Sequence, residues 1–231
     1  MSRVSVFCSA AGGVGKTTLA LYSSKYLAKS KKVLLVDFTL HGSFESIIRV
    51  SKRKNGIGYL SNKFMKANNE TVDCIVFNEQ LKCDVLLNTD AIQMEKLDYK
   101  FVDFLINEFI EYDHIIFDTS FELSERNARL FQIADDINLV TIQDITVFWR
   151  TMKFTEILDK LMVDRYKLKV ILNKYTKQIA INIKEFESEI NIEFQCQIPS
   201  LKNEFINSHN SGDLVDNRKF LKGIKKIWEE Q

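Results

Sequence analysis

The chain has 231 residues, of which 45% are hydrophobic and 27% charged, and its formal net charge is +1. This hydrophobic share excludes a largely disordered chain, and the near balance of charge removes any global electrostatic case for nucleic-acid binding. The four cysteines form no CxxC pair or zinc-like cluster, and we see no secretory leader and no apolar run of bilayer length. We therefore expect one domain over residues 1–231, in the cytoplasm, with reduced thiols.

Short aliphatic runs alternate along the chain with longer stretches of helical spacing. The predicted strands are Val4–Cys8, Val33–Asp37, Asp84–Asn88, His114–Asp118, Asp136–Ile142, Lys167–Asn173 and Ile192–Gln197. Helical spacing is clearest over Lys16–Lys29 and Thr146–Met162. The runs Val33–Val36 and Ile115–Phe117 are apolar without alternation, as in strands buried on both faces. The pattern predicts an α/β fold, a mainly parallel twisted sheet with helices on both faces.

Between the first predicted strand and the first predicted helix, residues 8–19 read CSAAGGVGKTTL. Glycines let backbone N–H groups turn inward around phosphate oxygens, and the helix adds the positive end of its dipole. We expect Lys16 to meet the β- and γ-phosphates of a nucleotide, Thr17 to bind magnesium and Thr18 to lie near the α-phosphate. The predicted phosphate-binding residues are Ala11, Gly12, Gly13, Val14, Gly15, Lys16, Thr17 and Thr18. Because Ala10 stands where the strict motif has glycine, a turn without ligand is the alternative.

Two aspartates, Asp37 and Asp118, each end a predicted buried strand. Ligands of such sheets sit at the carboxyl ends of the strands, so both aspartates are expected beside the phosphate loop. A carboxylate there can hold magnesium, and we predict Thr17, Asp37 and Asp118 as metal ligands. Lys16 joins the two aspartates as the predicted catalytic set. The alternative for either aspartate is a side chain that caps the next helix.

On these residues the chain resembles the ParA/MinD family of P-loop ATPases, a branch of the SIMIBI class, almost end to end. Gly12–Thr18 looks like the family's deviant Walker A loop, Val33–Ser43 like its first switch region and Tyr112–Thr119 like its Walker B strand. Val170–Lys174 is similar to the family's strand that ends in an adenine-reading Asn, and Ile198–Pro199 resembles the loop that closes over the base.

The resemblance implies the P-loop NTPase fold, ATP or ADP with Mg²⁺ as cofactors, and a homodimer. It makes Asn173 the predicted base-recognition residue, since an amide offers a donor and an acceptor together, and it places Pro199 beside the base. A helix-capping role is the alternative for Asn173.

Two positions depart from the family pattern. Ala11 stands where relatives carry a signature lysine, which reaches across the nucleotide-sandwiched dimer to the partner's phosphates. By analogy with arginine fingers, losing such a cation costs about 10³–10⁵ in rate. Thr39 stands where the family usually has a second aspartate, and a threonine cannot act as a base. We therefore expect nucleotide binding with slow or absent hydrolysis.

The absent lysine, together with Ile142–Phe154 and Asn207–Gly212, resembles the TadZ/CpaE-like branch, which positions Tad-type pilus machinery at a cell pole. The leading hypothesis is a nucleotide-dependent positioning scaffold that docks partner proteins of a polar pilus or secretion assembly. The first alternative is an active partitioning, flagellar- or division-site ATPase stimulated by a partner, DNA or membrane. The second is a metabolic enzyme on the same fold, such as a dethiobiotin-synthetase-like ligase.

Two basic regions raise the question of further partners. The cluster Arg49, Lys52, Arg53 and Lys54 is either a DNA- or lipid-binding patch or a solvated helix end, and we favour the helix end. The segment Arg218–Gln231 is amphipathic, with lysines opposite its apolar face. We expect it to close the fold by packing on the sheet, and peripheral contact with the inner face of the membrane is the alternative.

Overall fold

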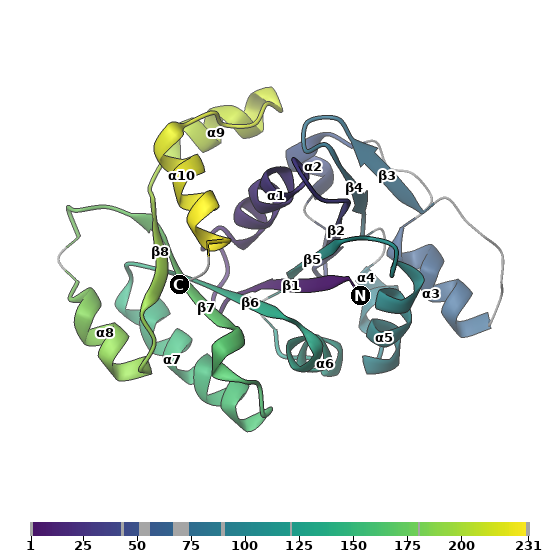
Figure 1. Cartoon of the computed structure of the whole chain (residues 1–231), viewed down its shortest axis with the longest axis horizontal. Helices are drawn as coiled ribbons and strands as arrows, with labels where there is room; N and C mark the ends of the chain where they lie inside the picture. The colour runs from purple at the N-terminus through teal and green to yellow at the C-terminus, as the bar shows by residue number, and fades with distance from the viewer. Residues whose placement is uncertain are drawn as a thin grey trace.

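The computed structural model describes residues 2–42, 44–50, 56–66, 74–88, 91–120, 122–179 and 181–229 of the chain. Within this part, eight strands form one sheet in the order β3-β4-β2-β5-β1-β6-β7-β8 (Figure 1). The strands are β1 (Arg3–Cys8), β2 (Val33–Phe38), β3 (Ile75–Asn78), β4 (Cys83–Leu86), β5 (His114–Thr119), β6 (Asp136–Ile142), β7 (Leu168–Tyr175) and β8 (Phe194–Pro199). Neighbours run parallel except for β3 with β4.

The central strands β2 and β5 are buried along their whole length, as their unbroken apolar runs predict. The predicted fold class, a mainly parallel sheet between two helical layers, is confirmed. The edge strand β3 was not predicted, because it is short and half-exposed, and its Phe77 side chain is 53% exposed. Its neighbour β4 ends at Leu86, short of the predicted end at Asn88.

Consecutive side chains of β1 face the two helical layers in turn. Val6 packs in the core beneath α3 to α8, and Phe7 packs in the core beneath α1, α2, α9 and α10 (Figure 1). The helices are α1 (Lys16–Leu27), α2 (Phe44–Ile48), α3 (Ile57–Lys66), α4 (Ala91–Glu95), α5 (Tyr99–Glu108), α6 (Glu125–Ile133), α7 (Ile145–Lys160), α8 (Ile183–Ile190), α9 (Lys202–Ser211) and α10 (Arg218–Ile227). No helix in the described ranges is long and apolar enough to cross a bilayer.

The helix starts differ in a way that positions the site. Side chains cap the first turns of α5, α6, α7, α8 and α10 by accepting hydrogen bonds from backbone N–H groups; these caps are Asp98, Ser124, Asp144, Asn182 and Asn217. Helix α1 instead starts after Gly15 in the left-handed region, and no side chain caps it; α9, which starts after Leu201, also lacks a side-chain cap. An uncapped helix start offers its N–H groups and the positive end of its dipole to an anion.

The C-terminal helix α10 packs on the sheet through buried Phe220, Ile224 and Ile227, in agreement with the expected closing helix. At Gly223 the helix approaches β8 so closely that a Cβ atom would lie 3.1 Å from Ile198. Its lysines are exposed, so their charge stays in water while the apolar face is buried. Of the predicted segment, residues 230–231 lie outside the described residues, as do Ser43 and the cluster members Lys52, Arg53 and Lys54.

Candidate nucleotide site

The loop between β1 and α1 turns through two glycines in the left-handed region. Gly13 has φ of 71° and Gly15 has φ of 96°, which residues with a side chain rarely adopt. Inside the loop, the Ser9 hydroxyl donates to the carbonyl of Ala11 at 2.6 Å. Ala11 itself is 5% exposed and packs in the core beside α1. The position of the family's signature lysine therefore holds a buried methyl group.

Strand β7 holds this loop from one side. The buried side chain of Asn173 donates its amide to the carbonyl of Val14 at 2.8 Å. Its nitrogen would lie 2.3 Å from a Cβ atom at Gly15, so only glycine permits this approach. The Lys174 ammonium group donates to the carbonyl of Gly13 at 2.6 Å. The base-reading role of Asn173 stays a prediction, and the contacts show in addition that the residue supports the loop.

On the opposite side of the loop, Thr17 and Asp118 form a pair. The Thr17 hydroxyl donates to one carboxylate oxygen of Asp118 at 2.6 Å, and the other oxygen is buried without a hydrogen-bond partner. Burial raises the pKa of Asp118 to about 7, and nearby Asp37 adds to the rise, whereas the Thr17 hydrogen bond and the Lys16 charge lower it. A buried carboxylate oxygen without a partner is costly, and a hard cation would satisfy it.

The oxygen ligands that Thr17 and Asp118 offer suit Mg²⁺, which also binds water and phosphates, better than they suit a metal bound by side chains alone. In the described ranges no three His, Cys, Asp or Glu side chains cluster as metal ligands. Magnesium commonly keeps several waters and binds one or two carboxylates together with substrate phosphates. Thr17 and Asp118 are the residues that would hold it here, and when bound it would neutralise charge on the phosphates.

Asp37 lies next to Asp118 in the register of β2 with β5. One of its oxygens accepts from the Thr39 hydroxyl at 2.6 Å, and the other accepts from the Phe44 N–H at 3.2 Å, at the start of α2. Asp37 therefore makes the contact expected of a helix cap. The role of Asp37 as a metal ligand stays a prediction. The Thr39 hydroxyl donates to this carboxylate and does not supply the missing second acid.

A pocket of about 470 Å³ opens beside the loop. Its lining joins a polar end from the loop and β7 to an apolar end from β8, α9 and α10; the lining residues are Gly13, Gly15, Lys16, Thr17, Thr18, Asn173, Lys174, Pro199, Ser200, Leu201, Lys202, Phe205, Ile206 and Phe220. Such a pocket suits a ligand with a polyphosphate at one end and a flat apolar group at the other.

Most residues predicted to bind the nucleotide line this pocket; three of them do not, and neither do the predicted metal ligands Asp37 and Asp118. Ala11, Gly12 and Val14 are absent from its lining: Ala11 and Val14 are buried, while Gly12 is exposed at the tip of the loop. No sequence pattern predicted a role for Lys174, although this residue directly follows Asn173. The apolar end of the pocket was not predicted either, because Phe205 and Phe220 have the spacing of ordinary core residues.

Comparison with known proteins decides the family. The model of the CobQ/CobB/MinD/ParA nucleotide binding domain (CbiA) matches residues 5–211. The chain belongs to this family. None of the curated protein sequences matches it.

Solved members of the ParA/MinD group share the fold. A ParA family ATPase from Chlorobium tepidum has a TM-score of 0.85 at 19% identity, with 97% of each chain covered. MinD from Pyrococcus horikoshii, a septum site-determining protein complexed with Mg-ADP, has a TM-score of 0.78 at 21% identity, with 98% of this chain and 94% of that chain covered. A putative plasmid partition protein from Borrelia burgdorferi, bound to AMPPNP, has a TM-score of 0.80 at 18% identity, with 98% and 97% covered.

Proposed function

We propose that this ParA/MinD-like protein binds ATP or ADP with magnesium and acts as a positioning scaffold with slow or absent hydrolysis. The observation that carries the proposal is the uncapped start of α1 beside the Thr17–Asp118 pair, whose free carboxylate oxygen is buried. Anion donors and a cation ligand thus adjoin one pocket. MinD complexed with Mg-ADP and the partition protein bound to AMPPNP, both of similar fold, support the choice of ligand.

Two groups that would promote hydrolysis are missing from the site, which supports slow turnover. The methyl group of Ala11 is buried where relatives place a cation, and the Thr39 hydroxyl is engaged with Asp37. Neither group can stabilise charge that develops on the transferred phosphoryl group or deprotonate water. When hydrolysis is slow, the nucleotide-bound form of the protein persists and can bind partner proteins for a long time.

We assign the scaffold to the TadZ/CpaE-like branch, in the cytoplasm and at a cell pole, with homodimers that dock proteins of a pilus or secretion assembly. The departure at Ala11 supports this assignment, as do Asp144, which caps α7, and Gly212, which ends α9 with φ of 77°. The test is the position of the fluorescently tagged protein in cells. Uniform distribution of the tagged protein, with normal pili in a deletion strain, would rule out this branch.

Nucleotide binding and turnover test the core of the proposal on purified protein. We expect micromolar ATP affinity with magnesium and negligible turnover, whereas turnover near one per second would contradict the scaffold. Lys16→Ala should abolish binding, and Lys25→Ala on the same helix serves as the matched control. ATP binding by the Lys16→Ala variant that equals the parent would overturn the site assignment.

The missing cation has its own test. If it limits catalysis, Ala11→Lys should raise ATP turnover, by up to roughly 10³-fold by analogy with arginine fingers. Ala10→Lys adds the same charge one residue earlier and controls for charge alone. Turnover unchanged by Ala11→Lys would shift the block to Thr39.

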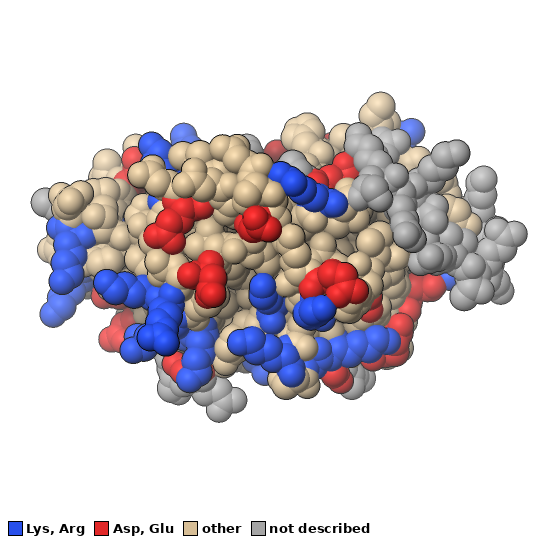
Figure 2. Space-filling model, turned by 90° about the horizontal axis from the view of Figure 1, so that it is seen from above, with Lys and Arg blue, Asp and Glu red and all other residues tan. Residues whose placement is uncertain are grey.

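A partner-stimulated ATPase is the second candidate, favoured by the exposed lysines of α10. Lys219, Lys222, Lys225 and Lys226 all face solvent. Viewed from above, however, acidic side chains lie among the basic ones (Figure 2). Such mixing weakens attraction to DNA or anionic lipid. Turnover that rises with DNA or anionic vesicles would favour this candidate, and an unchanged rate with both would favour the scaffold.

A further inference from the structure

Lys174 has an unusual backbone conformation near the end of β7. Its φ of 52° lies in the left-handed region, which is disfavoured for residues with a side chain. The register of β7 with β8 shifts between Leu172 and Tyr175, so Lys174 sits in a bulge-like irregularity. Bulges and left-handed residues re-aim a side chain and are common beside functional sites.

The re-aimed side chain reaches the phosphate loop. Its ammonium group donates to the carbonyl of Gly13 at 2.6 Å, and the preceding Asn173 donates to the carbonyl of Val14 at 2.8 Å. Two consecutive residues of β7 thus hold two consecutive carbonyls of the loop. Both also line the pocket of about 470 Å³.

Peptide geometry links these carbonyls to the groups that bind phosphate. In a planar trans peptide the C=O and N–H bonds point in opposite directions. A hydrogen bond to the Gly13 carbonyl therefore fixes the direction of the Val14 N–H, and one to the Val14 carbonyl fixes that of the Gly15 N–H. A cation on the Gly13 carbonyl also polarises that peptide and makes its N–H a stronger donor.

We propose that Lys174 is a positioning residue that orients the Val14 amide toward a polyphosphate and adds positive charge to the loop in cis. The inference rests on the proposed nucleotide binding and extends it. It adds a second cation of this chain, besides Lys16, at a loop in which Ala11 offers none.

Calorimetry with Mg-ATP and with magnesium tripolyphosphate tests the proposal. Because Lys174 acts on the loop and not on the base, Lys174→Met should weaken both ligands by a similar factor, about tenfold. Lys174→Arg keeps a charged donor and should restore most of the affinity. Lys177→Met removes the same charge from a nearby exposed position outside the pocket lining and should leave both affinities unchanged.

A spectroscopic measurement separates positioning from a general loss of stability. In ¹⁵N-labelled protein the Val14 amide signal should move in Lys174→Met and return toward its parent position in Lys174→Arg. The thermal unfolding midpoint should stay within the error of the parent, since the Lys174 side chain is exposed. Lys174→Gln, which loses the charge, provides a second variant if the methionine disturbs folding.

The outcomes separate this inference from the proposed function. If the parent binds Mg-ATP but Lys174→Met and Lys174→Gln bind both ligands as tightly as the parent, the inference fails and the proposed function stands. Equal weakening by Lys177→Met would also overturn the inference. If the parent binds neither ligand, both fail together.

Discussion

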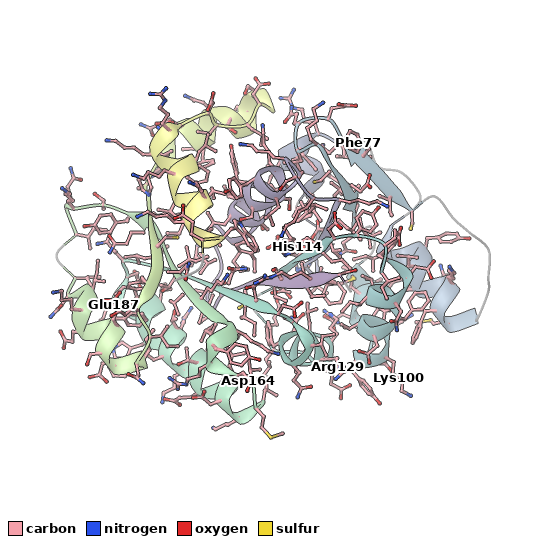
Figure 3. The ribbon with its side chains drawn as sticks, viewed as in Figure 1. Phe77, Lys100, His114, Arg129, Asp164 and Glu187 are labelled. Atoms are coloured by element: carbon pink, nitrogen blue, oxygen red, sulfur yellow. The ribbon has the colours of Figure 1, made fainter. Side chains whose placement is uncertain are left out.

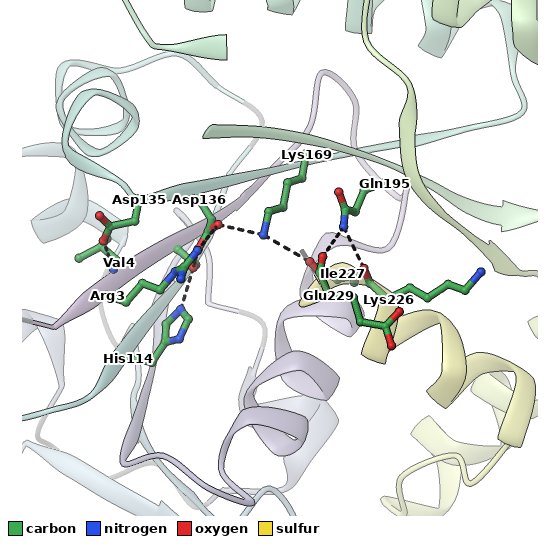
Figure 4. Close-up of polar contacts among 11 residues, drawn as sticks. Arg3, Val4, His114, Asp135, Asp136, Lys169, Gln195, Lys226, Ile227 and Glu229 are labelled. Atoms are coloured by element: carbon green, nitrogen blue, oxygen red, sulfur yellow. Dashed lines mark hydrogen bonds and ion pairs between the residues drawn. The ribbon is translucent and has the colours of Figure 1, made fainter. Parts of the chain in front are cut away.

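Two buried aspartates have contrasting surroundings: Asp136 lies at the amino ends of the strands, the amino edge of the sheet, and Asp118 lies at their carboxyl ends, the carboxyl edge. Asp136 begins β6 and forms ion pairs with Arg3 at 2.7 Å and Lys169 at 2.9 Å (Figure 4). Burial alone would raise its pKa, but these two cations outweigh burial and lower the pKa to about 2. Asp118 near the end of β5 has one hydroxyl donor, Thr17, and burial raises its pKa to about 7.

This difference in pairing distinguishes a structural site, whose charges are paired within the chain, from a site with an unpaired group that a ligand would satisfy. At the amino edge the chain supplies its own cations, and a buried charge that is paired and hydrogen-bonded is tolerated. At the carboxyl edge a similar carboxylate keeps a buried oxygen without a partner. A strongly perturbed carboxylate beside a pocket is typical of a functional site.

The amino edge also anchors the C-terminal helix. His114 lies in the interior, with the centre of its ring 5.3 Å from the centre of the Trp228 ring, whereas Lys100, Arg129 and Asp164 lie around the outside (Figure 3). Lys169 donates to the carbonyl of Ile227 (Figure 4), and its ammonium group lies 5.6 Å from the centre of the Trp228 ring. Lys169, one of the two cations that pair with Asp136, therefore also contacts the end of α10.

The largest expected effect is the loss of the amino-edge carboxylate. Asp136→Ala removes the carboxylate that Arg3 and Lys169 share. Because the Arg3 side chain is half-exposed, the free energy of unfolding should fall by about 3 kcal/mol, the low end for a broken buried pair. Urea denaturation measures it. Asp159→Ala breaks the half-exposed pair with Arg165 and should cost less than about 1 kcal/mol. Similar losses for the two variants would remove the distinction between a buried network and a surface pair.

The matching change at the carboxyl edge should act on binding, with no comparable loss of stability. Asp118→Asn removes a buried charge that has a single donor, so without ligand the free energy of unfolding at neutral pH should stay the same or rise. Magnesium-dependent ATP binding, measured by calorimetry, should weaken by about 10–100-fold. A loss of stability as large as that of Asp136→Ala would mean that Asp118 is also a structural carboxylate.

The two edges should respond to pH with opposite signs. Asp118 has a folded pKa of about 7 against 3.8 in the unfolded chain, so the folded state binds more protons between these values and stability falls as pH rises. Burial lowers the pKa of His114 to about 3 from 6.5, so there stability rises with pH. The charged groups that act on His114 are Lys31, Arg3 and Lys169, which lower its pKa, and Asp136, which raises it.

Between about pH 4 and 6.5 the two slopes should nearly cancel in magnesium-free parent protein, because each approaches about 1.4 kcal/mol per pH unit. Asp118→Asn should uncover the rise of stability with pH due to His114. His114→Gln should uncover the fall due to Asp118. Urea midpoints across this range measure both, and parallel profiles for the two variants would contradict the assignment of the slopes to opposite edges.

At these two edges, features encoded by neighbouring residues were predictable from the sequence, whereas contacts between residues far apart in the chain were not. The central strands and the loop around Lys16 were predictable, because apolar runs and glycine spacing are local signals. The partners of Asp136 were not, since Arg3 and Lys169 reach it from β1 and β7, far apart in the chain. The edge strand β3 and the role of Lys174 likewise depend on pairing and on a register shift that no local pattern encodes.

The smallest expected effect comes from deleting one hydroxyl at each edge. The Ser5 hydroxyl donates to Asp136 at 3.0 Å, and because it has a single proton it accepts from the His114 ring nitrogen at 2.7 Å. At the carboxyl edge the Thr17 hydroxyl donates to Asp118. Ser5→Ala and Thr17→Val should each lower the free energy of unfolding by about 1 kcal/mol in protein without ligand. Only Thr17→Val should also weaken magnesium-dependent ATP binding, because only its hydroxyl lies beside the pocket. If Ser5→Ala weakened ATP binding equally, the two edges would be coupled, and the amino-edge network would belong to the nucleotide site.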